Sequence, residues 1–282
     1  MRPAMAPHAP DGALHLTWLG HSSFLLQCNG LNILTDPMFS ARASPLSWIG
    51  PRRLQPSVAS VGELPPIDLV LLSHDHYDHF DDGTVRALAR RFPDASWCAP
   101  LGVAKRLRAR GARTIHECDW WDRIEPLPSV QLDCVPAQHF SGRTPFDRDR
   151  TLWCGWTIAT GTHRICFVGD SGLHPEFERM GLECGPFDLI LMPIGAYEPR
   201  YVMQRVHMNP DEAVAAYASL IVPGHTAARA PVMAAMHWGT FALTDEPVDE
   251  PPRRAHAAWL NRGLDPRLLW ILAPGEMRAL DR

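Results

Sequence analysis

The pattern of hydrophobic and polar positions predicts a mixed succession of strands and helices from about residue 14 onward. Short apolar or alternating stretches predict strands at Leu14–Leu19, Ser23–Cys28, Asn32–Thr35, Ile67–Ser73, Ser96–Ala99, Val130–Val135, Leu152–Ala159, Arg164–Val168, Leu189–Pro193, Met233–Met236 and Leu268–Leu272. Apolar residues at helical spacing predict helices at Thr84–Arg91, at Val103–Arg110, after Asn209-Pro210, and at Arg253–Arg262. Because hairpins and crossovers are mixed, this order favours helices packed outside two central sheets.

The domain organisation expected from this pattern is simple. Residues 1–13, which contain Pro3, Pro7 and Pro10, predict a flexible amino-terminal tail. Residues 14–282 predict a single domain of the α/β (α+β) class, because no stretch has the composition of a linker and no repeat is present.

Composition narrows the class of protein. The formal net charge is −4 and no run of Lys or Arg stands out, which argues against a nucleic-acid partner. The first residues lack a signal-peptide core, and no apolar run reaches about 18 residues, so a cytoplasmic protein, or one peripheral to a membrane, is expected. The seven cysteines form no C-x-x-C pair, which predicts free thiols.

The strongest candidate for chemistry is the segment Ser73–His79 (SHDHYDH), which follows directly on the buried strand predicted at Ile67–Ser73. Side chains of an extended chain alternate with period two, so His74 and His76 point the same way and can bind one ion together. Asp78 and His79 fall on the turn into the next helix, where they can serve a second ion. Such nitrogen and oxygen ligands suit zinc, and iron or manganese less specifically. A solvated histidine-rich loop is the alternative.

This segment cannot complete two metal sites alone, because each ion needs three or more protein ligands and an open position. Three further candidates follow predicted strands, where active-site residues of open sheets gather: His139, Asp170 and His237. Gly169 and Gly172 beside the aspartate give the backbone room for a tight turn. Each candidate alone could be a turn residue, a helix cap or a core histidine. Together they predict a metal site distributed over strand ends.

The order His-x-His-x-Asp-His, His139, Asp170, His237 resembles the ligand order of the metallo-β-lactamase superfamily. Longer segments resemble its branch of N-acyl-phosphatidylethanolamine-hydrolysing phospholipases D (NAPE-PLD). These are TWLGHSS (Thr17–Ser23), LTDPMFSARASP (Leu34–Pro45), ELPPIDLVLLSHDHYDH (Glu63–His79), DWW (Asp119–Trp121), PAQHFSGR (Pro136–Arg143), GDSG (Gly169–Gly172), GPFDLILMPIGAYEPR (Gly185–Arg200), HMNPDEAV (His207–Val214) and HWGTFALTDEP (His237–Pro247).

The resemblance implies an αββα sandwich with two Zn²⁺ at one edge of its sheets. The ligand sets that it implies are His74, His76 and His139 for one ion, and Asp78, His79 and His237 for the other, with Asp170 bridging. It further implies that His21 and Asp36 orient ligands from outside the first shell. The predicted catalytic residues are His207 and Asp78. The predicted substrate contacts are Trp48, Gln138, Arg143 and Tyr197.

The implied reaction is hydrolysis of N-acyl-phosphatidylethanolamine to N-acylethanolamine and phosphatidate, in which a hydroxide shared by both metals attacks phosphorus. His207 could hydrogen-bond the developing charge or protonate the leaving alkoxide. Two alternatives stay open: a soluble-substrate hydrolase similar to ascorbate-phosphate lactonase, and a non-catalytic binding member of the superfamily. A long apolar groove would favour the lipid, whereas a small polar pocket would favour a phosphorylated sugar.

The expected partners are a phospholipid or another phosphodiester and, peripherally, a membrane, with a homodimer left open. The loop Ser44–Arg53 places Trp48 and Ile49 beside two arginines, a combination that suits the bilayer interface. In the alternative, Trp48 packs into the core. The segment Ile221–Pro231 is longer than the resemblance leads us to expect, and it predicts a surface loop beside the metal site or a lid over it.

Overall fold

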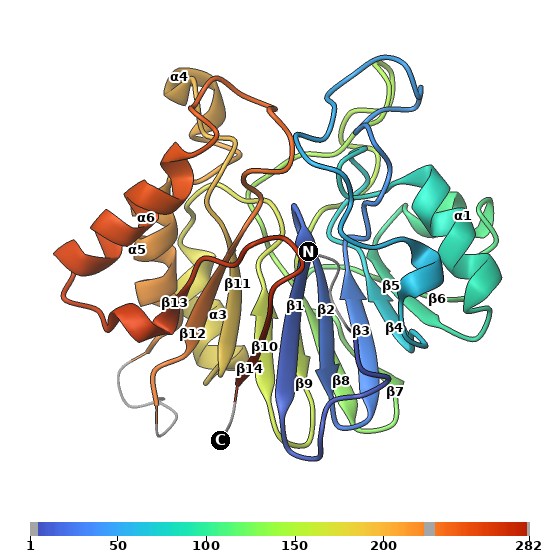
Figure 1. Ribbon diagram of the computed structural model, residues 1–282, viewed down its shortest axis with the longest axis horizontal. Helices are drawn as coiled ribbons and strands as arrows, with labels where there is room; N and C mark the ends of the chain where they lie inside the picture. Colours follow the sequence, from blue (N-terminus) through green and yellow to red (C-terminus); the bar gives the residue numbers. More distant parts are fainter. Residues whose placement is uncertain (1–4, 223–228, 281–282) are drawn as a thin grey trace.

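Two seven-stranded sheets lie face to face in the computed structural model, which describes residues 5–222 and 229–280 (Figure 1). The first sheet has the order β14-β1-β2-β3-β4-β5-β6, with β1 (Leu14–Gly20), β2 (Ser23–Cys28), β3 (Leu31–Thr35), β4 (Leu69–Leu71), β5 (Ser96–Pro100), β6 (Thr114–Cys118) and β14 (Met277–Leu280). The second has the order β13-β12-β11-β10-β9-β8-β7, with β7 (Arg123–Leu127), β8 (Val130–Val135), β9 (Gly155–Ala159), β10 (Arg164–Phe167), β11 (Leu189–Pro193), β12 (Val232–Met236) and β13 (Leu269–Trp270).

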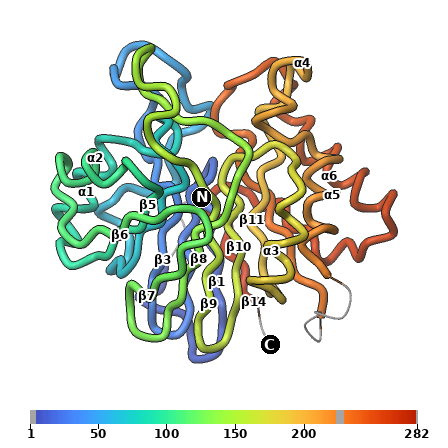
Figure 2. The backbone as a smooth tube through the Cα atoms, turned by 180° about the vertical axis from the view of Figure 1, so that it is seen from behind, coloured from blue at the N-terminus to red at the C-terminus, as the bar shows by residue number. Residues whose placement is uncertain are grey.

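Strand direction brings many carboxyl ends to one edge of the sandwich. In the first sheet β3, β4, β5 and β6 are parallel neighbours. In the second, β10, β11 and β12 are parallel, and β8 runs the same way because it is antiparallel to β9, which is antiparallel to β10. The loops that follow these strands therefore gather at a single edge, called here the loop edge, at the top of Figures 1 and 2.

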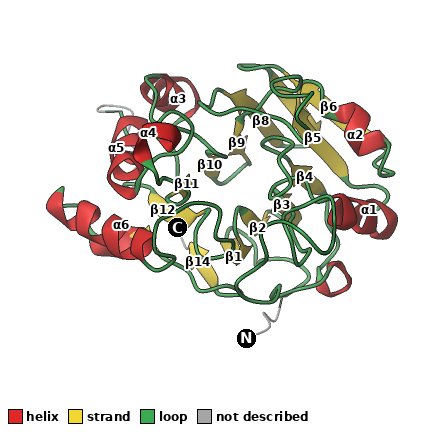
Figure 3. Cartoon of the chain, turned by 90° about the horizontal axis from the view of Figure 1, so that it is seen from above, coloured by secondary structure: helices red, strands yellow, loops and turns green. Residues whose placement is uncertain are grey.

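Helices cover the outer faces of both sheets, as the view from above shows (Figure 3). The first sheet is covered by α1 (Asp82–Arg91) and α2 (Ala104–Arg108), and the second by α3 (Glu176–Cys184), α5 (Pro210–Leu220) and α6 (Glu250–Asn261). Shorter elements are η1 (Val61–Glu63), α4 (Arg200–Met203) and η2 (Pro266–Leu268). Asn209 and Glu212 form a capping box at the start of α5, which explains why the predicted helix begins there.

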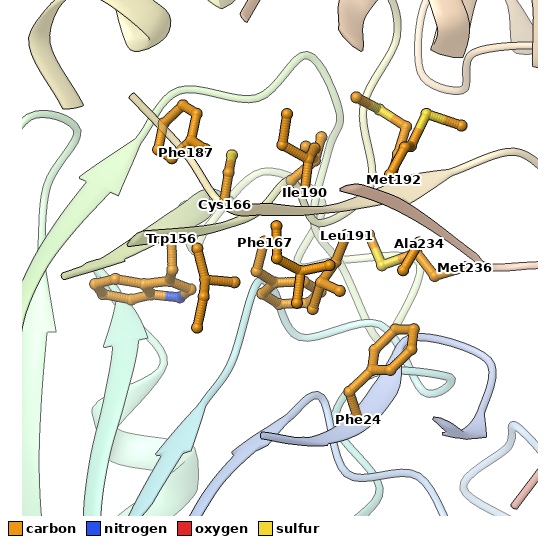
Figure 4. Close-up of a cluster of buried hydrophobic side chains, with 14 of the residues drawn as sticks. Phe24, Trp156, Cys166, Phe167, Phe187, Ile190, Leu191, Met192, Ala234 and Met236 are labelled. Carbon is orange, nitrogen blue, oxygen red and sulfur yellow. The ribbon is translucent and has the colours of Figure 1, made fainter. Parts of the chain in front are cut away.

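The core lies between the sheets and under the helices. Figure 4 shows Trp156, Phe167 and Leu191 of the second sheet on the face turned toward Phe24 of the first, whereas Ile190 points to the opposite face. All five side chains are buried, as expected for strands covered on both faces. Trp156 also donates its indole Nε1–H to the carbonyl oxygen of Leu72 at 2.9 Å, which ties the two sheets together.

The fold class predicted from the sequence is confirmed, whereas several element predictions are incomplete. The final predicted strand is wrong over most of its length, because only Leu269–Trp270 pairs, and β14 follows instead. β6, β7, β14, α3 and α4 were not predicted. The three strands have partly exposed residues, so they lack a continuous apolar run.

Two further sequence expectations concern the ends and loops of the chain. Near the amino terminus, Gln27 donates to the carbonyl of Ala6, and Asn32 donates to that of Pro7, so this stretch contacts the first sheet. Residues 223–228 of the segment Ile221–Pro231 lie outside the described residues. The described residues of this segment adjoin the amino end of β12, whereas His237 follows the carboxyl end of that strand. Among the described residues, no helix is both long and apolar enough to span a bilayer.

Candidate metal centre

The predicted ligand residues lie together at the loop edge, each just past the end of a strand. The segment after β4 carries His74, His76, Asp78 and His79, and the segments after β8, β10 and β12 carry His139, Asp170 and His237. Gly169 precedes the aspartate with φ +68°, and a Cβ there would lie 2.7 Å from the carbonyl oxygen of Cys154. The glycine is therefore needed for the close approach that turns Asp170 inward.

One group of donors comprises His74, His76 and His139, whose nearest ring nitrogens could all contact a single ion. His74 Nε2 lies 2.8 Å from His76 Nδ1, and His139 Nε2 lies 3.2 Å from the same Nδ1. The ring of Phe140 packs 4.5 Å from that of His76 and 4.8 Å from that of His139. An apolar ring thus limits water around these donors.

A second group comprises Asp78, His79, His237 and also His21. Asp78 Oδ2 lies 3.4 Å from His79 Nε2, 3.6 Å from His237 Nε2 and 3.0 Å from His21 Nε2. His21 was predicted to act from outside the ligand shell, yet its ring nitrogen is as close to Asp78 as the nitrogens of the predicted ligands are. Its place in this group was not apparent from the sequence.

Asp170 lies between the two groups. Its Oδ2 is 3.0 Å from His237 Nε2 and 3.1 Å from His79 Nε2 on one side. On the other side it is 3.9 Å from His74 Nε2 and 3.7 Å from His139 Nε2. A carboxylate in this position can contact ions held by either group, which is the geometry that a bridging ligand requires.

The electrostatics of the cluster suit cations. Burial lowers the pKa of His139 to about 3, so its imidazole is neutral and can act as a ligand. Burial alone would also lower the pKa of His237, but Asp170 opposes it and raises the pKa to about 9. In the same way Asp170 and Asp78 raise the pKa of His79 well above its usual value. Protons on these two imidazoles balance the buried carboxylates, and a metal ion can replace them.

Unpaired atoms at the centre test whether an ion fits. His79 Nε2, His237 Nε2 and Asp170 Oδ1 are buried and lack a hydrogen-bond partner. Buried polar atoms are rarely left unpaired, and both imidazole nitrogens face Asp170 Oδ2. The residues present therefore fit a pair of zinc ions, and iron or manganese would use the same atoms.

Asp36 contacts His79 through Nδ1, the ring nitrogen that does not face Asp78 and Asp170. Its Oδ2 lies 2.7 Å from His79 Nδ1 and accepts a hydrogen bond from Ser73 Oγ at 2.5 Å, while Oδ1 accepts from the Ser73 amide at 2.7 Å. Asp36, His21 and His237 have φ values of 31°, 56° and 58°, a region that costs energy for any residue except glycine. The surrounding fold holds this strain at the site.

His207 lies beside the donors, whereas Trp48 is exposed to solvent. The ring of His207 is 4.9 Å from that of His139, its Nε2 is 4.0 Å from Asp170 Oδ2, and its Nδ1 has no partner. Trp48 is 72% exposed, which excludes the alternative in which it packs into the core.

The other three predicted substrate contacts have partners within the protein. Tyr197 is buried and donates its hydroxyl to Glu250 on α6. Gln138 donates its amide to the carbonyl of Arg205 at 2.7 Å. Arg143 is buried and donates to the carbonyl oxygens of Asp75 and Phe80, within and just after His74–His79, called here the ligand segment. The sequence motifs could not predict the partners of these three side chains, because each partner comes from a segment distant in the chain.

The chain is similar in sequence to curated proteins. The chain is 42% identical over 247 residues to an uncharacterised protein of Mycobacterium tuberculosis, across 87% of this chain and 64% of that one. It is 38% identical over 245 residues to the N-acyl-phosphatidylethanolamine-hydrolyzing phospholipase D 1 of Caenorhabditis elegans, across 84% of this chain and 66% of that one. The chain thus spans slightly less than two thirds of the length of these curated relatives.

The fold has a close counterpart among solved structures. Igni18, a metallo hydrolase from Ignicoccus hospitalis, aligns with a TM-score of 0.70 at 21% identity, over 96% of this chain and 99% of that one. The family model of the Beta-lactamase superfamily domain matches residues 31–238, which include every candidate ligand except His21. The chain therefore belongs to the β-lactamase superfamily and has the fold of its metal-dependent hydrolases.

Proposed function

We propose that the protein is a two-zinc phosphodiesterase that hydrolyses N-acyl-phosphatidylethanolamine to N-acylethanolamine and phosphatidate. The observation that carries the proposal is the pair of donor groups on either side of Asp170. The similarity to the C. elegans phospholipase supports the choice of substrate class. Fold alone does not decide the reaction, so the substrate must be argued from the site.

The residues around the donors support attack at a phosphate. Zinc ions bound there would supply an activated water and positive charge for the phosphate oxygens. Burial lowers the pKa of His207 well below its usual value, so the imidazole is neutral. One ring nitrogen of His207 can therefore donate a hydrogen bond to a phosphate oxygen or to the leaving alkoxide. Asp78 Oδ2 accepts a hydrogen bond from His21 Nε2 and lies 3.4 Å and 3.6 Å from the Nε2 atoms of His79 and His237.

Exposed apolar side chains on the loop edge support a lipid substrate. They come from three separate segments and are called here the apolar rim: Leu46, Trp48, Ile49, Phe146, Tyr201 and Val202. Phe146 is 87% exposed and Tyr201 is 83% exposed. The loops and α4 that carry them lie at the top of Figure 1, on the same edge as the metal-site segments. Apolar residues presented together to solvent are typical of contact with a membrane surface.

A second candidate substrate is a small soluble phosphodiester or phosphorylated lactone. Such a substrate needs no space for acyl chains, and the cavity beside His237, which is lined by Ala196, Trp238 and Phe241 among others, offers none. That cavity holds only about 20 Å³, which is too small for an acyl chain. If the substrate is N-acyl-phosphatidylethanolamine, its acyl chains must therefore stay in the bilayer or lie along the apolar rim.

A metal and product analysis tests the proposed function. Purified protein is expected to bind about two zinc ions, and His76→Ala or Asp170→Asn to abolish turnover. His256→Ala, an exposed histidine on α6, is the matched control and retains activity. The zinc-loaded protein is then offered N-acyl-phospholipids, soluble phosphodiesters and lactones, and the products are identified by mass. Release of N-acylethanolamine supports the lipid. Turnover of a soluble substrate alone supports the second candidate, and full activity without metal would refute both.

Vesicle binding tests the apolar rim separately. Burial of an exposed aromatic side chain contributes roughly 2–4 kcal/mol, so Trp48→Ala and Phe146→Ser should each weaken binding to phosphatidylserine vesicles by at least about tenfold. Leu260→Ser, which alters an exposed apolar residue of α6, is the control. Unchanged binding by both rim variants would exclude this edge as the membrane contact.

A further inference from the structure

Arg143 lies behind the ligand segment, where it contacts main chain instead of solvent. Its side chain is 2% exposed. Nη1 donates to the carbonyl oxygen of Asp75 at 2.8 Å and to that of Phe80 at 2.7 Å. These two carbonyls bracket residues 76–79, which supply three candidate ligands. A single side chain therefore fixes both ends of this stretch.

The planar face of the same guanidinium is also engaged. Its central carbon lies 3.7 Å from the ring centroid of Tyr77 and 5.0 Å from that of Phe80. Nη2 forms an ion pair of 3.1 Å with Asp82 at the start of α1. Arg suits such a position because its fork donates to two acceptors while its flat face stacks on aromatic rings, which Lys cannot reproduce.

The Asp75 side chain is held from the opposite side. It is 1% exposed, and Oδ1 accepts a hydrogen bond of 3.1 Å from the Gly142 amide, while Oδ2 forms an ion pair of 2.9 Å with Arg106 Nε. Arg106 also pairs with Asp147 at 2.7 Å, and Asp147 accepts from the amide of Arg143 at 2.9 Å. The loop after His139 and the ligand segment are thus joined by charged and polar contacts.

We propose that a network of charged side chains positions the ligand segment and the segment that carries His139 against each other. Its members, named here the Arg143 network, are Arg143, Asp75, Asp82, Arg106 and Asp147. The network sets the spacing between the donors of His74–His79 and that of His139, and it touches no reacting atom. All five are positioning residues. For Arg143 this role replaces the contact with substrate that we expected from the sequence. The inference rests on the proposed metal centre. It follows from a buried, fully engaged guanidinium whose acceptors flank the candidate ligands.

The test compares Arg143→Met and Arg143→Lys with Arg123→Met. The control breaks the ion pair of Arg123 with the buried Asp133 on β8, away from both segments. Zinc affinity is measured by competition with a chromophoric chelator, and backbone amide exchange over residues 74–82 is measured on metal-free protein. Arg143→Met is expected to weaken zinc binding about 10–100-fold and to speed exchange in this segment, with Arg143→Lys between it and the native protein. Arg123→Met should change neither.

Zinc affinity within about twofold of the native protein, with unchanged exchange over residues 74–82, would overturn the inference. If Arg143→Met does not fold, Arg106→Met replaces it, because Arg106 is only partly buried and also contacts Asp75. That variant must shift both measurements in the same direction, or the inference is wrong. A native protein that binds no zinc would refute the proposed function, whereas the exchange comparison on metal-free protein would still decide the role of the network.

Discussion

Replacing Asp36 by asparagine should remove one metal from the centre through the tautomer of His79. In the native protein the Asp36 carboxylate can only accept, so His79 Nδ1 carries the proton that faces Oδ2 at 2.7 Å. Once a metal ion displaces the second proton of His79, Nε2 offers its lone pair on the side of Asp78 (3.4 Å) and Asp170 (3.1 Å). The side-chain amide introduced by Asp36→Asn would still accept from the Ser73 main-chain N–H with its oxygen, and its NH₂ group would face the imidazole instead.

That NH₂ group donates to Nδ1, which moves the imidazole proton to Nε2 and blocks the nitrogen aimed at the ion. Loss of a partner that orients a ligand typically costs 10–100-fold in metal affinity, or about 1.4–2.7 kcal/mol. Of the donors His74, His76 and His139, only His74 is linked to Asp36, and that link runs through the Ser73 hydroxyl, so one zinc of two should be retained.

Zinc competition and metal analysis of the folded Asp36→Asn protein measure this outcome. Asp68→Asn is the matched control, since Asp68 accepts from the Asn32 amide at the other end of β4. The expected result is one tightly bound zinc in Asp36→Asn and two in the control. Two zinc ions bound with native affinity by Asp36→Asn would refute the tautomer argument.

Zinc affinity should rise with pH toward about 9, because the ion displaces a proton from His237, whose pKa is about 9 without metal; calorimetry in buffers of different ionisation enthalpy would show no proton release if this is wrong. Trp156→Ala should lower the free energy of unfolding by about 3–5 kcal/mol, since the ring fills the space between the sheets; a loss below about 1 kcal/mol in urea unfolding would contradict it. The seven cysteines are free and buried, and burial raises the pKa of Cys28 to about 11. A thiol reagent should therefore label native protein far more slowly than unfolded protein, and equal rates would disprove this.

The local pattern of the chain was sufficient for the central elements and for part of the site. Continuous apolar runs such as Leu189–Pro193 correctly predicted strands, because full burial on both faces leaves that signature in the sequence. The segment His74–His79 concentrates candidate donors within six residues, so its chemistry was visible without any tertiary information. Edge strands such as β6 and β14 were missed because their stability comes from pairing with a distant neighbour.

The tertiary structure decided how these parts combine. Sequence spacing cannot state that His21 lies 3.0 Å from Asp78, because 57 residues separate them and only the packing of the sheets brings them together. Nor could it reveal that Arg143 contacts the backbone of the ligand segment, since a motif fixes the residue type and not its partners. The sequence by itself therefore determined which donors are available and at which strand ends they lie. Their convergence on Asp170 depends on the long-range pairing of strands, which no local pattern encodes.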